Sequence, residues 1–366
     1  MKFAFLIILL VYSISVYSQS KLKPGFDPEE YRTLLEITER TVDSSQYTQD
    51  IPYPFSCQRV FRSDSVGLNN RWDLWIRDDS VAIISIRGTI MRPDSWSENF
   101  YASMSPATGM LNLGNNKLFS YKLAKSNRAS VHSGWLIGLA YIGPSIVEKI
   151  NEYYTKGFKE YIILGHSQGG ALTYFVTAYL NYLDFGTIPS DVKFKTYSSA
   201  PPKPGNLFFS YDYDFMTRGG WSIRVYNSED WVPQTPISVQ TLNDFATINP
   251  YSDRDSMVKN MNLLDKIIFG YITSKVKNSL DGSKDILKTY MGKDIFKASI
   301  SKFLPKLTEP VMADDMYYYP CGVPVVLLAS DDYFEYMKTH PQPSYLFENH
   351  LMEPYYYLLN KIYFEK

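Results

Sequence analysis

The sequence predicts an α/β fold, with a mostly parallel central sheet flanked by helices, on two observations. Short apolar runs rich in β-forming residues recur at 81–86, 161–164, 194–197, 223–226 and 325–328. Helical patterns lie between several of these runs, at 136–153 and 171–183. Because strands that alternate with helices form parallel βαβ units, we expect the five runs to lie in one sheet.

A further helix is expected ahead of the first strand. It would begin at Pro28, which suits the first helical position, and run to about Thr41. Asp27 can cap its first turn, and Glu30 completes a capping-box pattern.

Residues 241–320 interrupt the alternation of strands and helices. Helical patterns at 259–271 and 286–304 have Lys-rich polar faces, and no strand is evident in this region. Since the strand pattern resumes at 322–328, we expect a helical insertion before the last strand, within a single domain that spans 19–366.

The composition is ordinary for a packed globular protein. Of the 366 residues, 45% are hydrophobic and 20% are charged. The formal net charge of −1 gives no reason to expect a nucleic-acid partner. The two cysteines, Cys57 and Cys321, can pair in an exported protein, but the sequence does not show whether they meet. With four histidines and no Cys/His cluster, no structural metal site is expected.

The first residues have the pattern of a secretory signal peptide. Lys2 supplies a positive charge, and residues 3–16 form an apolar run that is short for a membrane span. We expect residues 1–18 to be removed by cleavage after Ser18, and the mature protein to be extracellular. The alternative is an uncleaved N-terminal anchor.

The segment GHSQG at 165–169 matches the pattern G-x-S-x-G. An apolar strand precedes it and an amphipathic helix follows, which is the setting of a nucleophilic serine on a strained strand-to-helix turn. Small residues at Gly165 and Gly169 prevent collisions at such a turn, and the helix N-terminus directs N–H groups at developing negative charge. Ser167 is therefore a candidate nucleophile; the alternative is a plain glycine-rich turn.

A serine nucleophile needs a base, and in this arrangement an acid and then a histidine follow it along the chain. His132 precedes Ser167, and His166 is expected to point elsewhere from the turn. Of the two remaining histidines, His350 is preferred over His340, which lies in a loop with no evident anchor.

The acid is expected where the strand at 223–226 runs into a loop. Asp230 and Glu229 both follow this strand, and either carboxylate could orient an imidazole. The residue pattern alone leaves both open.

Taken together, these segments resemble the class 3 lipases, the fungal-type lipases with their feruloyl esterase and phospholipase relatives. ISIRGT at 84–89, with Trp96 and Asn99, is similar to that family's F-R-G-T…W…N stretch, and VHSGW at 131–135 to its V-H-x-G-F. GHSQGGAL at 165–172, TYSSAPPKPGN at 196–206 and the stretch 224–233 are similar to three further family motifs. The resemblance covers roughly 55–240 and resumes at 317–360.

The resemblance implies an α/β-hydrolase fold and a Ser167–His350–Asp230 triad, with Asp230 chosen over Glu229. It also implies an oxyanion hole formed by Thr89, through its N–H and its hydroxyl, and by the N–H of Gln168. No cofactor or metal is implied. The sequence departs from the family at Gln168, where leucine is usual.

The resemblance further implies a function: a secreted ester hydrolase of acyl lipids such as acylglycerols, working at a lipid–water interface. Residues 91–127 lie where the family has its lid. An esterase for feruloyl or acetyl groups on carbohydrate and a phospholipase are alternatives with the same chemistry. A non-catalytic binding protein on a hydrolase scaffold is the alternative from another class.

Overall fold

The computed structural model describes residues 20–42, 50–249 and 262–365, so the expected signal peptide at 1–18 lies outside the described residues. Its centre is a seven-stranded sheet with the order β1-β2-β3-β8-β9-β11-β13. The strands are β1 (Cys57–Arg62), β2 (Trp72–Arg77), β3 (Ala82–Ile86), β8 (Glu160–His166), β9 (Lys193–Ser199), β11 (Ser222–Asn227) and β13 (Val323–Leu327).

The five predicted strands are confirmed as β3, β8, β9, β11 and β13, which all pair in parallel. The sequence analysis did not predict β1 and β2, which extend one side of the sheet by antiparallel pairing. The reason is their composition: three of the six β1 residues are exposed and two are arginines, and Asp73 interrupts the apolar residues of β2, so neither strand has a continuous apolar run.

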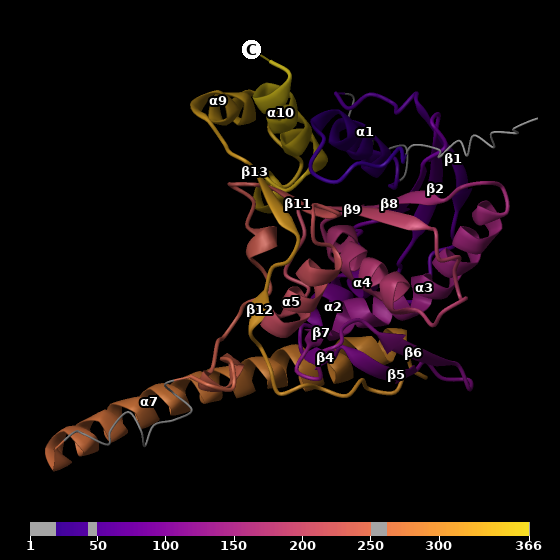
Figure 1. The fold of residues 1–366 in the computed structure, drawn as a ribbon. Coiled ribbons are helices and arrows are strands. Elements are labelled where there is room, and N and C mark those ends of the chain that lie inside the picture. Colours follow the sequence, from indigo (N-terminus) through magenta and orange to yellow (C-terminus); the bar gives the residue numbers. More distant parts are fainter. Residues whose placement is uncertain (1–19, 43–49, 250–261, 366) are drawn as a thin grey trace, which may run out of the picture.

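Helices cover both faces of the sheet, as Figure 1 shows. One face carries α3 (Ser133–Tyr154), α4 (Gln168–Tyr182) and α5 (Leu207–Met216); the other carries α1 (Pro28–Glu39), α9 (Asp331–Thr339) and α10 (Met352–Tyr363). The predicted helices at 136–153 and 171–183 are confirmed as α3 and α4.

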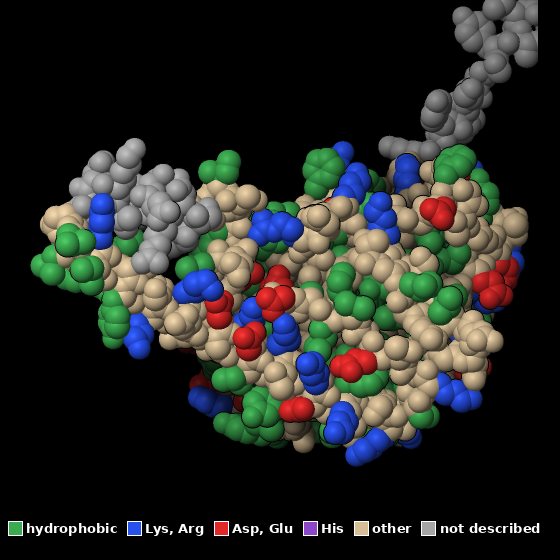
Figure 2. Space-filling view, turned by 90° about the horizontal axis from the view of Figure 1, so that it is seen from below, with side chains coloured by type: hydrophobic (Ala, Val, Ile, Leu, Met, Phe, Trp, Pro, Cys, Tyr) green, Lys and Arg blue, Asp and Glu red, His purple; other side chains and the backbone are tan. Residues whose placement is uncertain are grey.

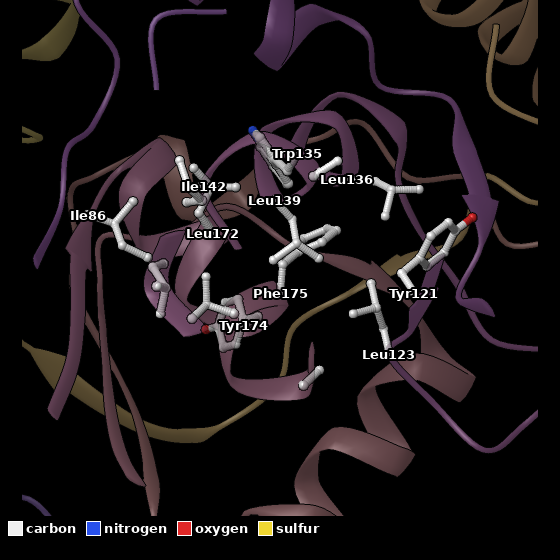
Figure 3. Close-up of a cluster of buried hydrophobic side chains, with 14 of the residues drawn as sticks. Ile86, Tyr121, Leu123, Trp135, Leu136, Leu139, Ile142, Leu172, Tyr174 and Phe175 are labelled. Atoms are coloured by element: carbon white, nitrogen blue, oxygen red, sulfur yellow. The ribbon is translucent and has the colours of Figure 1, made fainter. Parts of the chain in front are cut away.

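The larger core lies between the sheet and the pair α3 and α4. Figure 3 shows Leu139 of α3 and Phe175 of α4 close together in this cluster, and Ile86 of β3 belongs to the same cluster. All three side chains are fully buried, and each such burial stabilises the fold by about 1.5–3 kcal/mol. This packing holds the β8–α4 connection, which carries Ser167, against the sheet.

The first helix is capped as expected, but the capping box is not formed. The Asp27 carboxylate accepts the N–H groups of Glu29 and Glu30. The Glu30 carboxylate instead binds Lys195 Nζ at 2.5 Å and an Arg77 nitrogen at 3.0 Å. The side chain of Lys195 is 2% exposed, so its charge needs a buried partner, and this demand outweighs the local cap.

A smaller, four-stranded sheet has the order β12-β10-β7-β4 and lies beside the main body. Its strands are β12 (Tyr318–Tyr319), β10 (Gly205–Asn206), β7 (Ser130–His132) and β4 (Met104–Pro106). The expectation that 241–320 contains no strand is therefore wrong at β12, a two-residue strand too short to form an apolar pattern.

The lid candidate, 91–127, is mostly a packed part of the body. It contains α2 (Pro93–Phe100), β4 and the hairpin β5–β6 (Thr108–Asn112 and Leu118–Lys122). Phe119 and Tyr121 of the hairpin are buried in the larger core, so this part is not a detached cover. In contrast, Met91, just before α2, and Phe100, its last residue, have exposed side chains.

The helical character of the insertion is confirmed, but its division into two helices is wrong. One continuous helix, α7 (Leu263–Lys288), crosses the expected break at 272–285 and is followed by helical turns at Thr289–Asp294, Phe296–Ile300 and Ser301–Phe303. The segment between the two expected helices contains Ile272, Val276 and Leu280 at helical spacing, and its Gly282 costs about 1 kcal/mol, which the helix absorbs. Residues 259–261 of the expected helix lie outside the described residues.

Both cysteines are free, buried thiols. Cys57 belongs to the cluster on the α1 side of the sheet and Cys321 to the cluster on the α3 side, so the sheet separates them. In the described part of the chain, no helix combines the length and the apolar character that crossing a bilayer requires.

Candidate active site

Ser167 occupies a strained turn between β8 and α4. Its φ of 61° lies in the left-handed region, which costs a non-glycine residue about 1–3 kcal/mol unless its surroundings hold it there. Two backbone bonds do so: Ser167 N–H donates to the Ser199 carbonyl at 3.0 Å, and Ala171 N–H donates to the Ser167 carbonyl at 3.0 Å. The predicted strand and helix on either side of Ser167 are both present.

The glycines beside Ser167 are required by close backbone approach. A Cβ on Gly165 would lie 2.3 Å from the Gly169 carbonyl, and a Cβ on Gly169 would lie 2.3 Å from the Ile86 carbonyl oxygen. Real Cβ atoms do not come so close to backbone, which cannot move aside. Strand β8, helix α4 and strand β3 can therefore meet only if both positions lack a side chain.

The structure brings Asp230 and His350 together across 120 residues of sequence. His350 Nδ1 donates to Asp230 Oδ2 at 2.7 Å. The Asp230 carboxylate is 2% exposed and receives two further bonds, from the Tyr355 hydroxyl to Oδ2 at 2.7 Å and from Val232 N–H to Oδ1 at 2.9 Å. A buried carboxylate with three donors is held in one position and stays satisfied.

The two rival candidates lie elsewhere. Glu229 is exposed and accepts a bond from its neighbour Ser228. His340 is exposed and stacks on Tyr336, with ring centroids 4.2 Å apart. The geometry therefore favours Asp230 over Glu229, which the residue pattern left open, and agrees with the preference for His350 over His340.

His350 also lies beside the residue before Ser167. The rings of His166 and His350 have centroids 5.0 Å apart, and His350 Nε2 is buried without a hydrogen-bond partner among the described residues. This nitrogen is the basic atom left over once Nδ1 has donated to Asp230.

The sequence analysis expected His166 to point away from the site. In the structure it instead contacts His350. Its Nε2 donates to the His350 carbonyl at 2.7 Å, and its Nδ1 accepts from the Ser199 hydroxyl at 2.9 Å. A carbonyl can only accept, so the proton is on Nε2. Burial lowers the pKa of His166 to about 3, so the ring is neutral at physiological pH and acts by holding the His350 backbone.

Thr89 and Gln168 lie together at the same edge of the sheet. Gln168 is the first residue of α4, so its N–H has no carbonyl partner within the helix. The Thr89 hydroxyl, expected as an oxyanion donor, gives its proton to Gln168 Oε1 at 2.7 Å and accepts Asn99 Nδ2 at 2.8 Å. That hydroxyl proton is therefore already engaged, and the two backbone N–H groups remain.

The Gln168 side chain extends this network toward a buried acid. Its Nε2 donates to Asn70 Oδ1 at 3.4 Å, and Asn70 Nδ2 donates to Glu98 Oε2 at 2.6 Å. Glu98 has no exposed surface, and burial raises its pKa to about 8, so it is largely protonated at neutral pH. Asn70 and Glu98 were missed by the sequence reading, because no local pattern marks a residue that becomes polar core.

Four aromatic side chains, here called the aromatic rim, extend from His350 toward solvent. Phe347 lies 5.9 Å from His350, and the chain of ring contacts continues with spacings of 5.3–5.8 Å. The rim consists of Phe347, Trp231, Trp96 and Phe100, of which Trp231 and Phe100 are exposed. It puts an apolar surface directly beside the His350 imidazole.

His132 lies behind the site. It caps α3 by accepting Trp135 N–H at 3.3 Å, donates to the Asn99 carbonyl at 3.2 Å and stacks on the Trp135 ring. Burial lowers its pKa to about 3. In the described ranges, no group of three or more His, Cys, Asp or Glu side chains is placed to hold a metal ion.

Comparison with known proteins gives one family match. Residues 83–240, which include Thr89, Ser167 and Asp230, match the model of Lipase (class 3). Similar solved structures include lipase II from Rhizopus niveus (18% identity, 57% of this chain and 74% of that chain, TM-score 0.41) and the Rhizomucor miehei triacylglyceride lipase (18%, 58% and 77%, 0.40). A Penicillium expansum triacylglycerol lipase is also similar (14%, 58% and 74%, 0.39). Curated proteins give no match.

Proposed function

We propose that this chain, whose residues 83–240 match the model of the class 3 lipases, hydrolyses lipid esters with Ser167 as nucleophile, His350 as base and Asp230 as its orienting acid. The family match supports a carboxylic ester hydrolase. The observation that carries the residue assignment is the 2.7 Å bond between Asp230 and His350, with His350 held against the residue that precedes Ser167.

In the proposed reaction, His350 Nε2 takes the proton of the Ser167 hydroxyl as its oxygen attacks the ester carbonyl. Asp230 stabilises the imidazolium that forms. The N–H groups of Thr89 and Gln168 donate to the oxyanion, a contribution of about 10²–10³ in rate for a single donor. The alcohol then leaves with the proton from His350, and water hydrolyses the acyl-enzyme by the same steps.

The aromatic rim supports an acyl lipid as the substrate. Trp96, Phe347 and Trp231 provide a continuous apolar surface that an alkyl chain can cover next to the scissile bond. We therefore propose acylglycerol-like esters over acylated carbohydrate.

Two further parts of the proposal concern the chain as a whole. The sequence of residues 1–18 supports export with cleavage after Ser18. The return of the chain from α7 to β12 and β13, which complete the two sheets, supports a single domain over 19–366 with 241–320 as an insertion.

Ser167→Ala tests the assignment of the nucleophile. The variant should lose more than about 10³ of the activity on soluble short-chain esters and should not be labelled by a fluorophosphonate probe. Ser190→Ala, at an exposed loop position, is the matched control and should retain both properties. Unchanged turnover in Ser167→Ala would remove Ser167 as nucleophile. Comparing tributyrin with feruloyl and acetyl glycan esters tests the substrate class.

A further inference from the structure

Helix α7 extends away from the body of the protein, as Figure 1 shows. Its C-terminal part is anchored to the body: Lys284 and Lys288 bind the Asp314 carboxylate at 2.7 and 2.5 Å, and Leu287 packs against Met104 and its neighbours. In Figure 2 the projecting end carries a group of hydrophobic side chains near lysine or arginine side chains.

The projecting half of α7 has an apolar face that no described part of the chain covers. Two rows with i, i+4 spacing make up this face, and rows with this spacing adjoin on one side of a helix. The members of this α7 face are Leu263, Ile267 and Tyr271 in one row and Leu264, Ile268 and Ile272 in the other. Their exposed fractions range from 49% to 76%.

We propose that the α7 face docks onto an anionic lipid surface, with the helix lying in the plane of the headgroups. From Leu263 to Ile272 the face is about 15 Å long at 1.5 Å per residue, enough to lie on a membrane but not to cross it. The inference rests on the proposed function for the reason to approach lipid, since the ester bonds would lie in such a surface.

The charges of α7 favour anionic lipid as the occupant. Between Asn262 and Asp281 the helix carries Lys266, Lys275 and Lys277 against Asp265 and Asp281, an excess of one positive charge, and Asp281 pairs with Lys277. Lysine side chains beside an apolar face can extend toward headgroups while their methylene stems stay on the apolar side. The Lys275 ammonium lies 5.5 Å from the centroid of the Tyr271 ring, on the α7 face itself.

A second copy of the chain fits this face less well. Two α7 faces packed against each other would bring like-charged lysines together, and like charges across a helix pair are unfavourable. Lys277 is paired with Asp281 of its own helix, so that acid is not available to a partner copy.

Vesicle binding of the full chain tests the proposal. Sedimentation with phosphatidylcholine vesicles containing phosphatidylserine should capture the protein, and added salt should weaken capture. Ile267→Gln with Ile268→Gln should lower the partition coefficient by about tenfold or more, because the apolar contact is lost without a charge change. Phe185→Gln, at a 98% exposed apolar residue in the loop after α4, is the control and should bind as the wild type does.

A second variant tests the charge. Lys275→Gln should lower binding about fivefold on vesicles with phosphatidylserine and should leave binding to pure phosphatidylcholine unchanged. If the double isoleucine variant binds vesicles as tightly as Phe185→Gln, the proposal is overturned. It is equally overturned if that variant instead converts a dimer to a monomer with vesicle binding unchanged, since the occupant is then a second copy.

The same variants separate this inference from the proposed function. Both α7 variants should hydrolyse a monomeric, water-soluble short-chain ester at the wild-type rate, whereas Ser167→Ala should bind vesicles normally but not hydrolyse. Failure of Ser167 as nucleophile would leave the vesicle result standing, and failure of vesicle binding would leave the Ser167 result standing.

Discussion

Tyr355 and Asp230 share a hydrogen bond at the centre of the site: the Tyr355 hydroxyl donates to Oδ2 at 2.7 Å, the same oxygen that binds His350. Tyr355 lies on α10, five residues after His350. The helix that follows His350, the proposed base, therefore also positions Asp230, the proposed acid.

Replacing Tyr355 should make the position of Asp230 less fixed and so weaken its hydrogen bond to His350. Tyr355→Phe removes one charge-assisted bond, worth about 1.5 kcal/mol or more, so we expect kcat to fall about tenfold with KM little changed. Tyr356→Phe, whose hydroxyl reaches Glu36 instead, is the neighbouring control and should keep kcat. Equal kcat in the two variants would show that Tyr355 is only a packing residue.

His166 should act as a positioning residue for His350. His166→Leu removes the donor to the His350 carbonyl, and we expect kcat to fall about 10- to 100-fold while KM stays near its wild-type value. His166→Gln places an amide N–H near the position of Nε2 and should recover part of the loss. A general loss of packing would lower the activity of both variants equally. Steady-state kinetics on a soluble ester makes this comparison.

Gln168 should determine whether the Thr89 hydroxyl takes part in catalysis. Gln168→Leu removes the acceptor that engages this hydroxyl, so the proton becomes free for the oxyanion. We expect Thr89→Val to lower kcat by a larger factor in the Gln168→Leu background than in the wild type. A double-mutant cycle measures the difference. Identical factors in both backgrounds would show that the hydroxyl has the same role with or without Gln168.

Glu98 should make the protein less stable at alkaline pH. Burial raises its pKa from 4.5 in the unfolded chain to about 8 in the folded state, so between these values the folded state binds more protons. This contribution is fully present below pH 4.5 and is lost as the pH rises through about 8. Thermal unfolding from pH 6.5 to 9 should therefore show a smaller decline in Tm for Glu98→Gln than for the wild type. Glu335→Gln, at an exposed site, should keep the wild-type slope.

Two glycine substitutions should have opposite effects on stability. Gly169→Ala places a methyl group 2.3 Å from the Ile86 carbonyl oxygen, so we expect a Tm fall of many degrees or loss of soluble protein. Gly282→Ala lies in α7 with no atom within 4 Å of the new methyl group, and should raise stability by up to about 1 kcal/mol. Thermal unfolding of both variants checks the pair. A stable Gly169→Ala protein would contradict the tight approach of α4 to β3.

Strands and helices were predicted correctly where a local pattern of residues is sufficient to identify them. The parallel strands are continuous apolar runs, because both faces of that sheet are covered, and α3 and α4 repeat their apolar residues with a helical period. The antiparallel strands β1 and β2 and the two-residue β12 lack such a pattern. Their structure depends on the neighbours that each of them meets.

For the candidate site, the sequence by itself determined Ser167 and its turn, because the strand, the glycines and the helix needed there are adjacent in the chain. The sequence context favoured His350 and the family resemblance favoured Asp230, but only the tertiary structure shows that these two side chains meet across 120 residues. The tertiary structure also decided that His166 donates a hydrogen bond to the His350 carbonyl, and that Gln168 links Thr89 to Asn70 and Glu98. Such partners are set by burial, which leaves each polar atom to find whichever donor or acceptor the fold brings within reach.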